Sequence, residues 1–328
     1  MQFVSFKNKQ KEERLGIIVK GEIIDLAKHA QMVGIRLPSN MKEFLNGFDS
    51  YIERAKEVEE SALKQTPLLG ENENDMEMLA AVPRPDSLRD AYAFRQHVET
   101  ARKNRGAEMI PEFDEFPVFY FSNRKAVIGS GDVMVEKDHL DKLDFELEVA
   151  VVISRHGKNI KAKDADDYIA GLMIMNDFSA RALQMKEMKL SLGPAKGKDF
   201  ATALGPMMVT MDELKKYKTK TPDGHIGDVY DLEMKAFYNG EQVSEGNLKD
   251  MHWTFAEIIE RVSYGVEIFP GDVIGSGTVG TGCFLEINGT KSREKGDSYK
   301  AVWLKEGDEI ELQVTGLGRL KNKVVLRK

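Results

Sequence analysis

Cysteine is almost absent from this sequence: Cys283 is the only one among 328 residues. A single thiol forms no intrachain disulfide and cannot build a thiolate zinc cluster. We therefore expect any bound metal to have oxygen or imidazole ligands.

Long apolar runs and concentrated basic patches are also missing. The apolar run at residues 149–153 is far shorter than the ~18 residues that span a bilayer, and the start, MQFVSFKNKQKEERLG, has no signal-peptide core. Lysines and arginines are scattered among acids, and the formal net charge is -7, which does not suit binding along a phosphate backbone. We expect a cytoplasmic protein that binds neither nucleic acid nor membranes.

Apolar residues make up 41% of the chain and charged residues 31%, which is enough for a soluble protein with a sizeable core. The polar, acidic segment 71–78 is followed by Pro83 and Pro85, a composition typical of a junction between two units. We predict a small N-terminal domain over residues 1–80 and a larger domain over residues 81–328.

Hydrophobic periodicity gives the predicted elements of each domain. In the first domain we expect strands at residues 4–6, 15–19 and 22–26 and helical structure over 40–63. In the second we expect strands at residues 118–121, 133–135, 145–153, 171–176, 206–210, 232–238, 273–276, 284–287 and 309–314. The small domain is therefore α+β, and the large domain is mainly β with some α.

Acidic residues alternate at the start of one predicted strand. Asp144, Glu146 and Glu148 are two positions apart, so a strand places all three on one face. The alternative is a strand that emerges into solvent with a charged outer end, since exposed acids are common on strands.

A second acid follows another predicted strand. Asp177 ends a buried stretch that passes into a helix, and Arg181 and Gln184 lie four and seven residues further on, on one helical face. A surface pair of Asp177 and Arg181, worth only ~0.3–0.5 kcal/mol, is the alternative. Several carboxylates together suit Mg²⁺ or Ca²⁺, which prefer oxygen ligands.

One histidine and two glycine-rich segments are further candidates. His97 follows Asp90 and Tyr92 in DAYAFRQH, although a lone histidine is more often structural or solvated. Gly197, at the start of the segment 197–200, and the four glycines of residues 275–287 permit close backbone approach to a ligand. We expect the second run to lead into a strand, where a nucleotide-binding motif requires a helix, so we interpret neither run as a nucleotide site.

Several segments resemble the fumarylacetoacetate hydrolase family, in order over about residues 83–320. DAYAFRQH looks like the family's Asp-x-Tyr-x-x-x-x-His segment, and LDFELEVA resembles its Glu-x-Glu strand. MNDFSARALQ, LGPAKGKDFAT, PVFY and CFLEINGT resemble further segments of the family. The resemblance implies a mixed β-roll catalytic domain of the fumarylacetoacetate hydrolase type, preceded here by a shorter N-terminal domain than that of the animal enzymes.

The resemblance also implies a role for each matching residue. The implied metal site consists of Asp90, Glu146, Glu148 and Asp177, with Lys198 and Thr202 beside the cation. The implied catalytic residues are His97 as general base, Glu286 as the residue that orients it, Lys198 as oxyanion donor, and Arg181 and Gln184. The implied substrate contacts are Tyr92, Tyr120, Thr278 and, after a one-residue gap, Arg105.

The function that the resemblance implies is hydrolysis of a C–C bond in a β-diketo acid by a homodimer that uses Mg²⁺ or Ca²⁺. The expected substrate is fumarylacetoacetate, cleaved to fumarate and acetoacetate in tyrosine and phenylalanine catabolism. One alternative is another enzyme of the superfamily, such as an acylpyruvate hydrolase, a keto-acid decarboxylase or a sugar-acid dehydratase. A second is a non-catalytic protein stabilised by Ca²⁺; His97, Glu286 and Lys198 weigh against it, because a structural cation site needs no base.

Overall fold

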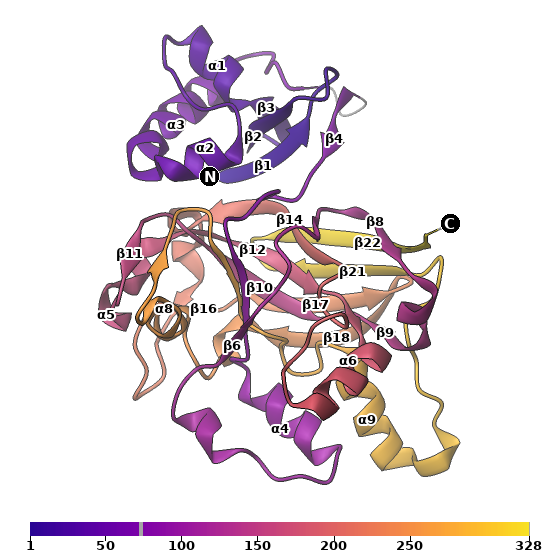
Figure 1. The fold of residues 1–328 in the computed structure, drawn as a ribbon. Coiled ribbons are helices and arrows are strands. Elements are labelled where there is room, and N and C mark those ends of the chain that lie inside the picture. Colours follow the sequence, from indigo (N-terminus) through magenta and orange to yellow (C-terminus); the bar gives the residue numbers. More distant parts are fainter. Residues whose placement is uncertain (72–74, 328) are drawn as a thin grey trace.

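The structure is a computed structural model that describes residues 1–71 and 75–327. An N-terminal module lies at one end of the molecule, and helices α4 (Arg95–Lys103), α6 (Arg181–Glu187) and α9 (Phe284–Lys295) lie on the far side of the larger unit (Figure 1). No helix among the described residues combines the length and apolar character that a membrane crossing requires. Part of the acidic segment expected at the domain junction, residues 72–74, is outside the described residues.

The N-terminal module has the expected α+β composition. Its elements are β1 (Gln2–Lys7), β2 (Glu13–Val19), β3 (Glu22–Asp25), α1 (Leu26–Met32), α2 (Met41–Asn46), α3 (Phe48–Leu63) and β4 (Glu77–Met78). The single helical stretch predicted over 40–63 is two helices, because the chain breaks at Gly47. Helix α1 was not predicted, and its first turn is capped by the Asp25 carboxylate, which accepts a hydrogen bond from the Lys28 backbone N–H.

The main sheet crosses the whole molecule. It contains eleven strands among the described residues and runs in the order β3-β2-β1-β14-β12-β10-β20-β5-β6, with β4 beside β1 and β7 beside β14. The members not yet given are β5 (Leu88–Ala91), β6 (Phe119–Phe121), β7 (Val127–Ile128), β10 (Leu147–Ile153), β12 (Ile169–Asp177), β14 (Thr202–Thr210) and β20 (Val273–Gly275). Because β1 pairs with β14, the N-terminal module shares this sheet with the large unit. The division at residue 80 stays a prediction.

The large unit contains a second sheet, whose strand order is β18-β17-β21-β22-β8. Its strands are β8 (Gly131–Val135), β17 (Glu233–Tyr238), β18 (Glu241–Asn247), β21 (Glu309–Val314) and β22 (Gly318–Leu326). Residues on both sheets, such as Val149, Ile174, Leu312 and Leu320, belong to one buried apolar cluster. The mixed strand and helix architecture confirms the predicted fold class.

Short elements complete the large unit. Three small ladders pair β9 (Leu143–Asp144) with β13 (Ser179–Ala180), β11 (Gly157–Lys158) with β19 (Glu267–Ile268), and β15 (Lys218–Thr219) with β16 (Val229–Tyr230). The remaining α-helices among the described residues are α5 (Ala162–Ala165), α7 (Met211–Leu214) and α8 (Phe255–Ser263), and short 3-10 turns lie between the elements.

One strand prediction is wrong. Residues 284–287 form the first turn of α9, although Phe-Leu-Glu-Ile favours a strand by local preference. The reason lies far away in the sequence: the Asp144 carboxylate accepts hydrogen bonds from the backbone N–H groups of Phe284 and Leu285, at 2.7 and 2.9 Å. Those two N–H groups need a partner at a helix start, and a carboxylate there is stabilised by the helix dipole.

Candidate active site

Three buried carboxylates meet where neighbouring strands of the main sheet end. Asp90 lies on β5, Glu148 on β10 and Glu146 just ahead of β10, and one oxygen of each lies within 4.8 Å of the others. Strand β20 pairs with both β10 and β5. At its end, a Cβ on Gly275 would lie 2.5 Å from Asp90 Oδ1 and 3.0 Å from Glu148 Oε2. The absence of a side chain at Gly275 therefore makes room for the carboxylates.

A fourth carboxylate joins this cluster through a lysine and a tyrosine. Lys198 Nζ donates to Glu146 Oε2 at 2.5 Å and to Asp177 Oδ2 at 2.7 Å. The Tyr120 hydroxyl donates to Asp90 Oδ2 at 3.0 Å and to Asp177 Oδ2. Asp177 is the last residue of β12, as expected for an acid at the carboxyl end of a strand. The acidic cluster is thus Asp90, Glu146, Glu148 and Asp177.

The crowding of these acids changes their proton affinities. Burial and the neighbouring charge of Asp177 raise the pKa of Asp90 to about 7. Burial and the charges of Asp90 and Glu146 raise the pKa of Glu148 well above its ordinary value. Burial disfavours ionised Glu146 as well, but Lys198 and Arg181 outweigh it and lower the pKa of Glu146 to about 2. Lys198 and Arg181 therefore favour the ionised form of Glu146, whereas burial and the neighbouring acids favour the protonated forms of Asp90 and Glu148 unless a further positive charge enters.

The donor set suits a hard divalent cation. Glu148 Oε2 is buried and receives no N–H or hydroxyl donor among the described residues. A protonated Glu148 can hydrogen-bond to Asp90, whereas the ionised form leaves this oxygen without a partner, a state that costs free energy unless a cation binds it. Thr202 Oγ1 lies 3.5 Å from Asp177 Oδ1, and Thr278 Oγ1 lies 3.5 Å from Glu148 Oε1. Carboxylate and hydroxyl oxygens of this kind fit Mg²⁺, Mn²⁺ or Ca²⁺ better than zinc.

Arg181 links the acidic cluster to a further acid. Its Nε donates to Asp144 Oδ2 at 2.9 Å, and two further guanidinium nitrogens donate to Glu146 Oε1 at 2.7 Å and Gln184 Oε1 at 3.0 Å. Arg181 is buried and makes no pair with Asp177, so the surface-pair alternative is wrong. Asp177 also lies on a strand, not on the helix face predicted to align it with Arg181 and Gln184, because α6 begins only at Arg181.

Asp144 is a site residue to which the sequence pattern alone gave no role. It is fully buried, and it holds Arg181 with one oxygen while both oxygens accept backbone N–H groups at the start of α9. Asp144 thereby fixes the position of Arg181 relative to the helix that carries Glu286. Its alternation with Glu146 and Glu148 was the available signal.

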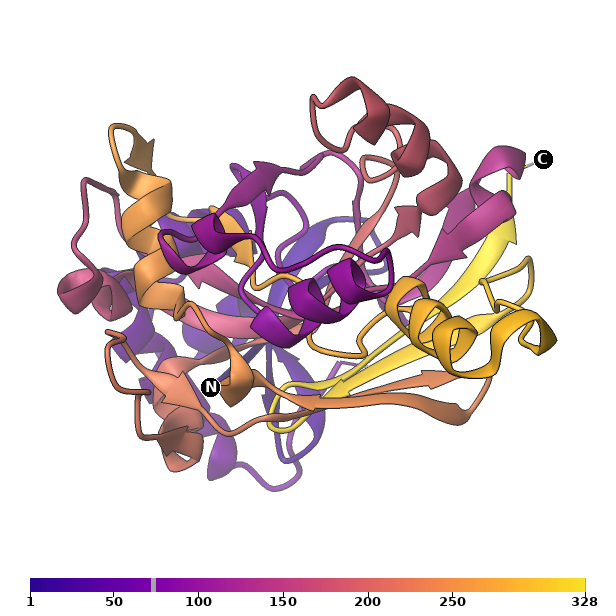
Figure 2. The same ribbon diagram turned by 90° about the horizontal axis from the view of Figure 1, so that it is seen from below.

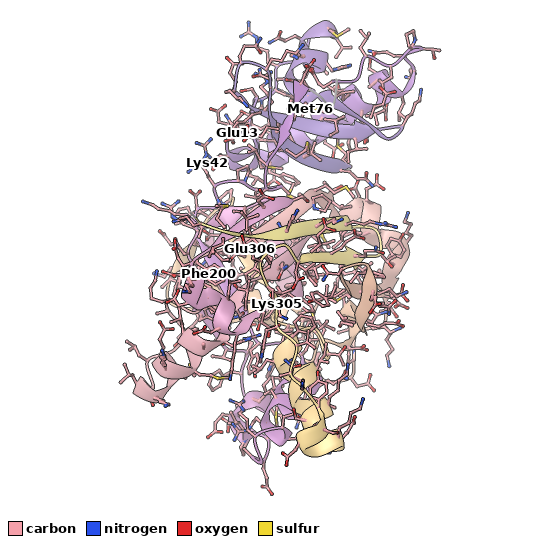
Figure 3. All side chains as sticks on the ribbon, turned by 90° about the vertical axis from the view of Figure 1, so that its right-hand side faces the viewer. Glu13, Lys42, Met76, Phe200, Lys305 and Glu306 are labelled. Atoms are coloured by element: carbon pink, nitrogen blue, oxygen red, sulfur yellow. The ribbon has the colours of Figure 1, made fainter. Side chains whose placement is uncertain are left out.

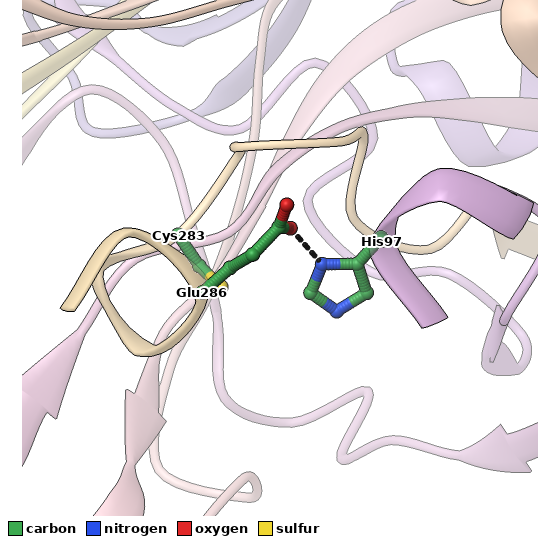
Figure 4. Close-up of side chains that lie close together, drawn as sticks. All are labelled: His97, Cys283 and Glu286. Atoms are coloured by element: carbon green, nitrogen blue, oxygen red, sulfur yellow. Dashed lines mark hydrogen bonds and ion pairs between the residues drawn. The ribbon is translucent and has the colours of Figure 1, made fainter. Parts of the chain in front are cut away.

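A histidine and a carboxylate from two helices face each other beside the acidic cluster. His97 lies on α4 and Glu286 in the first turn of α9, and these helices pack side by side (Figure 2). The distance from His97 Nδ1 to Glu286 Oε2 is 2.6 Å (Figure 4), which confirms the contact expected across 189 positions. The Tyr92 ring approaches His97 edge-on, with centroids 5.8 Å apart.

Two other predicted substrate contacts, Tyr92 and Arg105, lie on the His97 side of the site. Tyr92 is half-buried, and burial raises its pKa to about 12, so its phenol is neutral. Arg105 is exposed, and its Nε donates to the Ala101 carbonyl at 3.0 Å. The structure therefore brings Arg105 to the end of α4 but not into contact with the acidic cluster.

The glycine run after β20 also faces the acids. GSGTVG has the glycine spacing of a dinucleotide-binding fingerprint. The chain continues into helix α9 and not into the expected strand, so a following strand cannot be the argument against nucleotide binding. A different reason holds: the Gly277 backbone N–H donates to Asp90 Oδ1 at 3.1 Å, and Glu148 lies beside Gly275. Carboxylates at this position would repel a pyrophosphate.

The fold and the site together define an acid-rich enzyme site with a histidine–glutamate pair, and the comparisons give the family. The model of the fumarylacetoacetate (FAA) hydrolase C-terminal region matches residues 87–325. The chain belongs to the fumarylacetoacetate hydrolase family and is an enzyme of that superfamily.

The relatives have several different activities. Human oxaloacetate tautomerase FAHD2A, mitochondrial, is 30% identical over 290 residues, which cover 88% of this chain and 81% of that protein. Fumarylacetoacetase from Oryza sativa subsp. japonica is 32% identical over 246 residues, which cover 62% of this chain and 56% of that protein. Maleylpyruvate hydrolase from Sphingobium sp. SYK-6, solved in complex with manganese(II) and pyruvate, has a TM-score of 0.68 at 19% identity, with 100% of both chains covered. That structural likeness concerns the fold.

Proposed function

We propose that this protein is a cation-dependent hydrolase that cleaves a C–C bond in a β-diketo acid, with fumarylacetoacetate as its substrate and fumarate and acetoacetate as its products. This reaction would place it in tyrosine and phenylalanine catabolism. The observation that carries the proposal is the buried His97–Glu286 pair, 2.6 Å apart, next to the acidic cluster. Such a pair suits the activation of water, which a hydrolase needs.

Asp90, Glu146, Glu148 and Asp177 would hold the cation, as Mg²⁺ or Ca²⁺, with Lys198 and Thr202 beside it. A bound cation would orient the two oxygens of a β-diketone and polarise the carbonyl under attack. The unpartnered Glu148 Oε2 and the raised pKa values of Asp90 and Glu148 support this assignment, since both acids would be ionised beside a positive charge.

His97 would act as general base. Its Nδ1–H donates to Glu286, which leaves Nε2 free to accept a proton from water. The resulting imidazolium is stabilised by the Glu286 carboxylate, while the hydroxide adds to the carbonyl carbon. Glu286 is the positioning residue of this pair.

Lys198, Arg181 and Gln184 would stabilise the negative charge that develops on the attacked carbonyl oxygen. The carboxylates of Asp177 and Glu146 outweigh the cost of burial and raise the pKa of Lys198, so its amine stays charged. A well-placed donor of this kind contributes roughly 3–4 kcal/mol to catalysis. When the C–C bond breaks, its electron pair leaves as an enolate, which takes up the proton held by His97. Tyr92, Tyr120, Arg105 and Thr278 would contact the substrate.

A second candidate function is oxaloacetate tautomerisation, and the similarity to the human tautomerase, over 88% of this chain, favours it. Tautomerisation moves a proton between carbon and oxygen and needs no attacking water. Oxaloacetate would offer a cation held by the acidic cluster a ketone oxygen and a neighbouring carboxylate oxygen, much as a β-diketo acid would offer its two ketone oxygens.

A substrate panel tests the proposal. Purified protein is assayed with fumarylacetoacetate, an acylpyruvate and oxaloacetate, each with Mg²⁺ and after chelation, beside His97→Ala. We expect cation-dependent cleavage of fumarylacetoacetate that His97→Ala removes. Tautomerisation of oxaloacetate without cleavage of either diketo acid would replace the first candidate by the second, and cation binding without any turnover would support the non-catalytic alternative.

A further inference from the structure

A basic cavity lies on the surface at the junction of the N-terminal module and the large unit, away from the acidic cluster. Its volume is about 690 Å³, within the range of small-molecule sites. Its lining residues come from both units: Asn40, Lys42, Glu43, Asn46, Pro83, Arg84, Arg124 and Lys125. Figure 3 shows Lys42 at the edge of the N-terminal module beside this junction. Four cations against one carboxylate are unusual in a chain with a net charge of -7.

Two of these cations have no carboxylate partner among the described residues. Lys42 pairs with Asp86 at 2.7 Å and Arg84 with Glu13. Arg124 donates only to the Pro85 carbonyl, at 3.2 Å, and neither it nor Lys125 pairs with an acid in the described ranges 1–71 and 75–327. An anion entering the cavity would therefore find an available guanidinium fork and an available ammonium, with two paired cations close by.

The loop that carries Arg124 and Lys125 is hydrogen-bonded to the backbone of Asp199 and Thr202, beside the acidic cluster. Residues 122–126 connect β6, which contains Tyr120, to β7, which pairs with the start of β14 at Thr202. Within this loop, Asn123 Nδ2 donates to the carbonyl of Asp199, the residue after Lys198, at 2.9 Å. The Ala126 carbonyl accepts the Thr202 N–H at 3.1 Å. A shift of this loop would thus move the backbone next to Lys198 and Thr202.

We propose that this cavity binds a small multivalent anion, a di- or tricarboxylate or a phosphate compound, and that occupancy changes turnover through the loop 122–126. Arginine and lysine recognise both anion chemistries. None of the residues that line the cavity belongs to the proposed substrate site, so the anion acts as an effector and not as a substrate.

The test is titration calorimetry of the full chain at about 0.15 M salt, where long-range attraction is largely screened. Citrate and pyrophosphate are the two probes, and they distinguish carboxylate from phosphate ligands. The test variant is R124Q/K125Q. The control, R293Q/K163Q, also removes one exposed arginine and one exposed lysine, neither of which lines the cavity.

We expect one probe to bind the wild type and the control with equal affinity, and the test variant about tenfold or more weakly, because two charged contacts are lost. The same probe should change kcat or KM of the wild type and of the control but not of the test variant. Equal binding by all three proteins, or binding of neither probe, would overturn the site. Binding that leaves turnover unchanged would overturn the coupling. A circular dichroism spectrum and a urea unfolding midpoint equal to those of the wild type show that R124Q/K125Q is folded.

Discussion

The crowded acids make the cation-free protein less stable as the pH rises. Asp90 has a folded-state pKa of about 7 against an ordinary value of 3.8. Between these values the unfolded carboxyl is ionised while the folded one keeps its proton. The native state therefore binds more protons, and the free energy of unfolding falls by up to about 1.4 kcal/mol per pH unit. From pH 5 to pH 7 we expect Asp90 to account for a loss of about 2–3 kcal/mol.

Bound Mg²⁺ should remove this loss, because a cation binds the ionised carboxylates and does so better as the pH rises. The assay is urea unfolding at pH 5, 6 and 7, with chelator and with saturating Mg²⁺. Burial lowers the pKa values of His139 and His252, which gives the opposite slope, but this contribution is common to both conditions. The difference between the two series therefore isolates the acidic cluster.

Asp90→Asn is the matched variant, since it keeps the shape of the side chain and removes the titrating proton. Without cation, its free energy of unfolding should fall less than that of the wild type between pH 5 and pH 7. For the wild type, the free energy of unfolding could change with pH equally with and without Mg²⁺, or it could rise from pH 5 to pH 7 without cation relative to the Mg²⁺ series. Either result would refute the reasoning.

Three further predictions concern the cation, the assembly and Asp144. Alanine at Glu146 or at Glu148 should abolish Mg²⁺ binding in calorimetry while the circular dichroism spectrum stays near that of the wild type; full turnover by protein shown to be metal-free after chelation would contradict the cation's role. The active form should be a homodimer in sedimentation, which an active monomer at micromolar concentration would contradict. Asp144→Asn should lower the free energy of unfolding by about 3 kcal/mol, as expected when a buried charge loses its partner. It should also lower turnover, because Arg181 and the start of α9 both hydrogen-bond to this carboxylate. An unchanged free energy of unfolding in urea would contradict this role of Asp144.

Local pattern predicted the pieces of the site better than their arrangement. Period-2 spacing placed the acids of the Glu146 segment on one face, and the structure does bring Glu146 and Glu148 together. It did not reveal that β10 begins only at Leu147. Nor did it reveal that Asp144 turns to Arg181, because the position of Asp144 depends on contacts with α6 and α9.

Long-range contacts account for the errors as well. The first turn of α9 reads as a strand in isolation, and only the distant Asp144 carboxylate explains its helix. Nothing local connects His97 with Glu286, so their pairing was expected from the resemblance alone. The basic cavity left no sequence signal, since Lys42 and Arg124 come from separate units and from ordinary surface segments.

Turnover of fumarylacetoacetate by His97→Ala, Glu286→Gln and the double variant tests the central claim most directly, namely that these two residues act as one base. His97→Ala should remove nearly all turnover while Mg²⁺ affinity stays near that of the wild type, because the imidazole is not a ligand in this scheme. Glu286→Gln should lose less, since an amide still accepts a hydrogen bond from the ring at the 2.6 Å contact but does not stabilise the imidazolium. The double variant should be scarcely slower than His97→Ala alone, whereas strictly multiplying losses in kcat would contradict the account.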